Sequence, residues 1–245
     1  MSMSIAAPRA VNVERRYYMG MILAIVACVL LGFSRSFFLR PLFPGVHAPA
    51  EPWFYVHGAV FTAWLGLLLT QASLIGSRNL ALHKRLGIAG FVIVPLMVFL
   101  GTVGALIAAR RPGGFIAIPV PPLEFLVVPL YGLALFALFA GLGLAWRKTP
   151  QTHKRLILLA SIGLTEAAIA RWQFEPYLSF PPAAFWTSTL FLIPMIGWDF
   201  YSRGRVHPVT VWGGILLVSE GPLRELLSHT QGWMIFAKWA TGLLA

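Results

Sequence analysis

Three ionisable residues, His57, Glu166 and Glu220, lie inside apolar segments of this sequence. Ionisable side chains in apolar helices normally face the interior of a helical bundle or a water-filled cavity. An imidazole and two carboxylates together offer ligands for a transition-metal ion, and a desolvated glutamate is a proton acceptor. Glu124 and Arg224 lie in the same predicted half of the membrane and complete the set. The first function hypothesis is therefore a periplasm-facing site that binds or transports a small ligand, a metal ion or a proton.

The same residues also fit a purely structural role. Glu220 and Arg224 are four residues apart, which is an ordinary ion-pair spacing on one helix. Glu166 has the chemistry to pair with an arginine of another helix and so hold the bundle together. The structural interpretation is favoured, and the binding site is its alternative.

Composition indicates that lipid surrounds the elements that position these residues. Hydrophobic residues make up 58% of the 245 residues, charged residues 11%, and the mean hydropathy is +0.77. A soluble domain carries about 25% charged residues. Apolar stretches near the ~20 residues needed to cross a bilayer recur along the chain. Seven are expected as spans, at residues 17–34, 53–77, 87–109, 125–146, 156–170, 181–198 and 206–227.

These spans predict an all-α fold, a polytopic membrane helix bundle of about seven transmembrane helices in one domain covering residues 1–245. Residues 87–109 lack the alternating polarity of a barrel strand, so the spans are expected to be helices. A short interfacial helix is expected at 233–243, where Trp233, Phe236 and Trp239 share one face.

The distribution of Lys and Arg predicts an orientation. The N-terminal side and the alternate loops hold twelve of the 19 basic residues, and the opposite side holds seven. Cytoplasmic loops are enriched in these residues, so we expect a bacterial inner-membrane protein with a cytoplasmic N-terminus and a periplasmic C-terminus. The net charge of +11 has the same origin, and no nucleic-acid-binding pattern accompanies it. The expected partner is the lipid bilayer, and the oligomeric state is left open.

A recurring pattern divides the predicted spans into one anchor helix and three related hairpins. The three copies read RNLALHKRLG from Arg78, RKTPQTHKRL from Arg147 and RGRVHPVTVW from Arg203, with histidines at His83, His153 and His207. Glu166 and Glu220 each follow the histidine of their own copy by thirteen residues. In a helix this spacing is about 20 Å, so the two carboxylates are expected at similar depth.

The three repeated histidines raise two alternatives. They share a depth and so suggest a haem b ligand set, which would make the chain a haem- or quinone-binding redox protein. They lie at the membrane edge beside lysines and arginines, however, and a cytoplasmic interface with lipid phosphate is the favoured interpretation. The sequence has no nucleophile elbow, Walker loop or dinucleotide fingerprint, so no catalytic residue and no enzyme class is assigned.

Several segments resemble a family of uncharacterised bacterial multi-pass inner-membrane proteins. They are HGAVFTAWLGLLLTQ from His57, LHKRLG from Leu82, THKRL from Thr152, TEAAIARW from Thr165 and VHPVTVWGGILLVSEGPLR from Val206. The resemblance covers the chain from about the second span to the C-terminus. It implies an inner-membrane protein with repeated His-Lys-Arg-Leu helix starts, and it implies no activity and no haem ligands.

Overall fold

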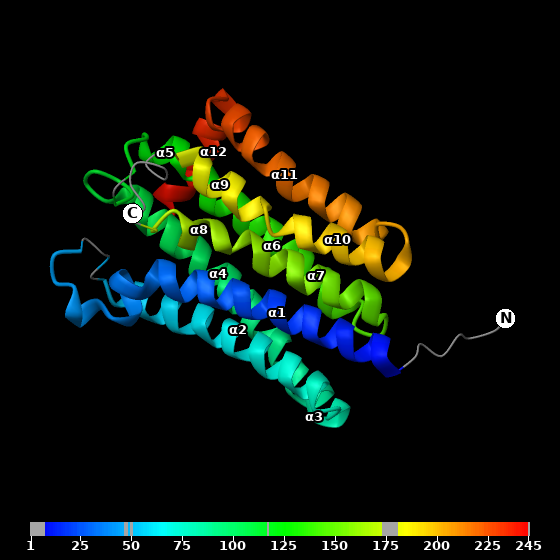
Figure 1. Ribbon diagram of the computed structural model, residues 1–245. Helices are drawn as coiled ribbons and strands as arrows, with labels where there is room; N and C mark the ends of the chain where they lie inside the picture. Colours follow the sequence, from blue (N-terminus) through cyan, green and yellow to red (C-terminus); the bar gives the residue numbers. More distant parts are fainter. Residues whose placement is uncertain (1–7, 47–48, 50, 117, 173–180, 245) are drawn as a thin grey trace.

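The computed structural model describes residues 8–46, 49, 51–116, 118–172 and 181–244, and all regular structure within these ranges is helical (Figure 1). Four helical stretches are long and apolar enough to cross a membrane. The first stretch, Asn12–Phe38, holds most of α1 (Pro8–Phe33) and the π-helical turn that follows it. The other three are α2 (Pro52–Gly76), the run of α3 (Leu80–Leu86) and α4 (Gly90–Arg110), and the run of α5 (Pro122–Phe125) and α6 (Val127–Ala145). The predicted all-α class and the membrane-type helices are confirmed.

The predicted number of seven spans is wrong for the described residues, where four helices qualify. The other three predicted spans form helices that are shorter or carry more charge. The fifth is α7 (Pro150–Gly163), interrupted at Leu164 before α8 (Thr165–Ile169), and the sixth is α9 (Pro181–Thr189) followed by α10 (Leu192–Arg203). The seventh is α11 (Pro208–Ser228), which contains Glu220, Arg224 and Glu225.

These shorter helices nevertheless belong to the same bundle. Figure 1 shows α1, α2, α4, α6, α7, α10 and α11 running side by side along one axis. The main hydrophobic core combines residues of α2, α6 and α7, including Trp64, Phe136 and Leu159. The Trp64 and Phe136 rings meet edge to face at 5.4 Å. We call the end where α1 begins the proximal end, and the end that holds α5 and α12 the distal end.

One glycine allows α1 to cross α8 at close range. A Cβ atom at Gly32 would collide with the backbone of Ala168. Neighbouring residues Cys28 and Ile169 are buried in a small cluster at this crossing. The close approach brings α8, and therefore Glu166, next to the first helix of the bundle.

The predicted interfacial segment 233–243 coincides with α12 (Gln231–Gly242). Its aromatic residues do not share one environment, because Trp233 is buried and Trp239 is 60% exposed. The Trp233 Nε1 donates a hydrogen bond of 2.8 Å to the Leu123 carbonyl oxygen. Thus α12 packs onto the distal end of the bundle through Trp233 and presents Trp239 outward.

Candidate functional site

Arg224 of α11 lies between two carboxylates at the distal end of the bundle. Its Nη1 and Nη2 atoms donate to the two Glu166 oxygens, each at 2.8 Å, and Nη1 also donates to Glu220 Oε1 at 3.1 Å. The side chains of Arg224, Glu166 and Glu220 are only 10%, 17% and 4% exposed. The structure therefore brings together three of the residues that the sequence singled out, and we call them the Arg224 cluster.

Three helices position the Arg224 cluster. Glu166 is the second residue of α8, directly after the interruption at Leu164, while Glu220 and Arg224 lie one turn apart on α11. From α9, the Phe185 ring lies 5.0 Å from the Arg224 guanidinium carbon, which adds a cation–π contact. Gly221 is required beside this ring, because a Cβ there would lie 2.5 Å from Phe185 Cε1. The cluster is thus enclosed by protein on several sides.

The charges of the Arg224 cluster do not balance. Two carboxylates face one guanidinium, so the cluster carries one surplus negative charge when both acids are ionised. Glu166 accepts two hydrogen bonds from Arg224, whereas Glu220 accepts one. Within the part of the chain that the structure describes, no second side chain bonds Glu220. A surplus buried charge is costly, and a proton on Glu220 would remove it.

Two other predicted site residues lie outside the Arg224 cluster. His57 is on α2, where its ring stacks on Phe61 at 4.1 Å and its Nδ1 is buried without a partner. Glu124 of α5 lies 3.7 Å from Nδ1 of the exposed His229. Among the described residues no group of three or more His, Cys, Asp or Glu could hold a metal ion. The predicted metal set of His57, Glu166 and Glu220 is therefore not brought together.

A second charged cluster, which the sequence analysis missed, lies at the proximal end. Asp199 of α10 is the only aspartate of the sequence and is fully buried, as is Arg155 of α7. Arg155 donates to Asp199 Oδ1 through Nε at 2.9 Å and also through Nη2. Asp199 Oδ2 accepts from the Thr210 hydroxyl at 2.6 Å and from the His207 backbone N–H at 3.0 Å. We call these residues the Asp199 cluster.

The Asp199 cluster is balanced in charge and fully bonded. The remaining Arg155 nitrogen, Nη1, donates to the backbone and side-chain oxygens of Gln151 at 2.8 and 2.7 Å. Burial alone would raise the pKa of Asp199, but the hydrogen bonds from Arg155, Thr210 and the His207 amide outweigh it and lower the pKa. The cluster therefore fixes α7, α10 and α11 to one another, and each Arg155 nitrogen and each Asp199 oxygen has a hydrogen-bond partner within the protein.

The histidine at His207 belongs to this junction. It is buried, and its Nδ1 accepts a 3.1 Å hydrogen bond from the Val209 N–H at the start of α11. Burial, followed by the charges of Arg155 and Arg203, lowers the pKa of His207 to about 4. The imidazole is therefore neutral at pH 7 and acts as a helix cap.

The other two repeated histidines each contact the preceding helix. The Nδ1 of His153 lies 2.7 Å from the Gly143 carbonyl oxygen, and the Nδ1 of His83 lies 3.4 Å from that of Gln71. Each imidazole thus closes the connection between two consecutive helices. The first two predicted copies have this contact, and the third does not. The repeat stays a prediction.

Comparison with known proteins identified no relative of this chain. No family model, no curated protein and no solved structure matches the chain. The resemblance to bacterial inner-membrane proteins therefore stays a prediction, and the function is inferred from the geometry of the two clusters.

Proposed function

We propose that this membrane protein binds and conducts a proton at the Arg224 cluster, with Glu220 as the acceptor. The observation that carries the proposal is the buried set of two carboxylates around one guanidinium. Since Arg224 occupies the space between the carboxylates, a metal ion would have to displace it. A proton neutralises the surplus charge without displacing any atom, and it is favoured among the ligands that the sequence suggested.

Two helix interruptions and one proline within a helix, all near the cluster, support a transport role. The break at Leu164 precedes Glu166, and the break at Leu190 and Phe191 follows the helix of Phe185. Pro222 lies inside α11 between Glu220 and Arg224 and removes a backbone hydrogen bond there. Transporters commonly hold their coupling-ion sites at such interrupted helices. The predicted orientation would open this end toward the periplasm.

The experiment compares proton uptake by the wild-type protein and by the Glu220→Gln variant. Glutamine keeps the shape of Glu220 and removes its titration. Potentiometric titration of the purified full chain across neutral pH is expected to show about one proton fewer per chain in Glu220→Gln. Proteoliposomes that enclose a pH-sensitive dye are expected to acidify more slowly with the variant after an external acid pulse.

Glu225→Gln is the matched control, because Glu225 lies on the same helix with a side chain that is 80% exposed. This variant should conduct protons like the wild type. If Glu220→Gln and Glu225→Gln titrate and conduct alike, while both unfold at the wild-type temperature, the proposal is overturned. In that case the Arg224 cluster is only a structural ion pair.

A haem-binding redox role is the second candidate, and one observation favours it. The Nδ1 atoms of His83 and His153 both face backbone carbonyls. Metal-binding histidines are commonly oriented in this way, with Nε2 left for the metal. Reduced protein would then show Soret and α bands, and a colourless preparation without iron would exclude haem.

A further inference from the structure

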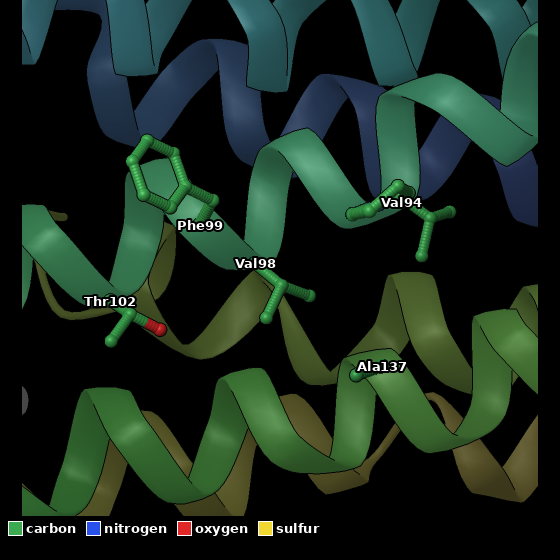
Figure 2. A pocket seen from close by; sticks show the side chains of 6 residues that line it. Val94, Val98, Phe99, Thr102 and Ala137 are labelled. Carbon is green, nitrogen blue, oxygen red and sulfur yellow. The ribbon is translucent and has the colours of Figure 1, made fainter.

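An apolar groove runs along the outer faces of α4 and α6. It has a volume of about 480 Å³ and is lined by Val94, Pro95, Val98, Phe99, Thr102 and Ala137. Figure 2 shows the groove between the two helices, with Val98 and Thr102 of α4 above Ala137 of α6. Both helices belong to candidate membrane spans, so the groove faces the region that acyl chains occupy. Its volume lies within the ~300–1,000 Å³ of small-molecule sites.

The side of α4 that lines the groove continues toward a basic residue at the proximal end. Phe91 lies on the same face of α4 as Val94 and Val98, at the i, i+3, i+7 spacing of one helical stripe. The Phe91 side chain is 46% exposed, and the Arg147 guanidinium carbon lies 5.2 Å from its ring centre. The apolar side of α4 therefore ends, at the proximal end, next to the positive charge of Arg147.

The cations at this edge have no anionic partner among the described residues. The proximal end has two described acids, Glu14 and Asp199, and these pair with Lys154 and Arg155. Arg147 donates one bond, from Nη1 to the Leu144 carbonyl oxygen at 3.2 Å, which holds the guanidinium in place. The exposed Lys148 follows directly in the chain. Arg147 and Lys148 thus present unpaired positive charge beside an apolar groove.

We propose that this edge binds an anionic phospholipid, with its phosphate on Arg147 and Lys148 and one acyl chain in the α4–α6 groove. The guanidinium supplies planar donors that match a phosphate group. Basic residues at the membrane surface attract anionic lipids electrostatically. The apolar lining selects a ligand with a hydrocarbon tail, because a free phosphate ion would leave the groove unused. This site is separate from the Arg224 cluster and does not depend on proton binding there.

The headgroup is tested by native mass spectrometry of the detergent-purified full chain. Phosphatidylglycerol is expected to stay bound at detergent concentrations that remove phosphatidylcholine. The Arg147→Gln variant should bind phosphatidylglycerol about fivefold more weakly, as expected for one basic residue at the surface. Arg203→Gln is the matched control, since it removes the same charge at the same end of the bundle, from the last residue of α10, and should bind like the wild type.

The role of the groove is tested by Val98→Trp, which fills the groove. The control is Ile215→Trp on the outer face of α11, where Ile215 is 63% exposed. Val98→Trp should weaken phosphatidylglycerol binding and Ile215→Trp should not, with both variants unfolding at the wild-type temperature. Inorganic phosphate should fail to displace the lipid. The proposal is overturned by equal losses in Arg147→Gln and Arg203→Gln, by equal binding of both lipids, or by displacement with phosphate. It is also overturned if the chain is a dimer that Val98→Trp dissociates with lipid binding unchanged.

Discussion

The tetrapeptide His-Lys-Arg-Leu occurs twice in this chain and has two different environments. At residues 83–86 it ends the short helix α3, and Lys84, Arg85 and Leu86 are exposed. At residues 153–156 it lies in the first half of α7, where Arg155 is 1% exposed and Leu156 is fully buried. The same four residues therefore form a surface edge in one place and part of the core in the other.

The difference comes from a residue that is distant in the sequence. Arg155 is buried because Asp199, 44 residues later, accepts two of its hydrogen bonds. No described acid pairs with Arg85, so its charge stays exposed. Local sequence fixes the helix and its histidine contact, whereas a tertiary partner decides whether an arginine enters the core.

The largest expected effect follows from Asp199→Ala. This change leaves Arg155 as an uncompensated buried charge, which should lower the free energy of unfolding by about 3–5 kcal/mol. Thermal unfolding of the purified protein in detergent measures the loss, and the yield from membranes is expected to fall with it.

Two controls sharpen this result. Arg85→Ala removes the corresponding arginine of the exposed segment and should change the unfolding temperature little. The double change Arg155→Met with Asp199→Leu removes both buried charges and should recover much of the lost stability. Equal effects of Asp199→Ala and Arg85→Ala would contradict the distinction between the two segments.

Acid is expected to weaken the Asp199 cluster through His207. The pKa of His207 is about 4 in the folded chain, while an unfolded imidazole titrates near 6.5. Below pH ~6.5 the unfolded state therefore binds more protons, and stability falls until the pH reaches about 4. The pKa of Asp199 is lowered in the folded chain, so its protonation reduces stability further only below pH 3.8, the ordinary pKa of an aspartate.

His207→Asn isolates the histidine contribution, because asparagine also caps a helix start and does not titrate. Unfolding temperatures measured from neutral pH to about pH 4 should decline less in this variant than in the wild type. An unchanged decline would show that the acid sensitivity arises elsewhere.

The smallest expected effect is the difference in stability loss between removing the His153 contact and removing the His83 contact. His153→Ala removes the 2.7 Å contact with Gly143 and should cost about 1 kcal/mol of stability. His83→Ala removes a 3.4 Å contact with Gln71 and should cost less. Parallel thermal unfolding of the two variants checks the order, and the reverse order would mean that distance does not rank these contacts.

The apolar helices could be predicted from the sequence, and the charged ones only in part. The spans predicted at 53–77, 87–109 and 125–146 match α2, α4 and α6 closely, because uninterrupted apolar residues define them. The span predicted from residue 156 begins inside a longer helix, since α7 begins at Pro150. Its basic residues, Lys154 and Arg155, join the helix because acids from other helices pair with them.

The candidate site shows the same limit. The four-residue spacing of Glu220 and Arg224 predicted their ion pair, but the fork between Arg224 and Glu166 spans 58 residues and depends on packing. Asp199 was missed because it directly follows a predicted span. Its rarity, as the only aspartate in a chain with few acids, was the available signal.

The pairing of Arg155 with Asp199 also sets an order of events during synthesis. Arg155 leaves the ribosome 44 residues before its partner, a delay of about 2–9 s at about 5–20 residues per second. During that interval the guanidinium has no carboxylate and is more stable in water or among headgroups than in the core. The segment from Pro150 to Gly163 therefore takes its final place only after α10 has been made, so the bundle closes late from its C-terminal half.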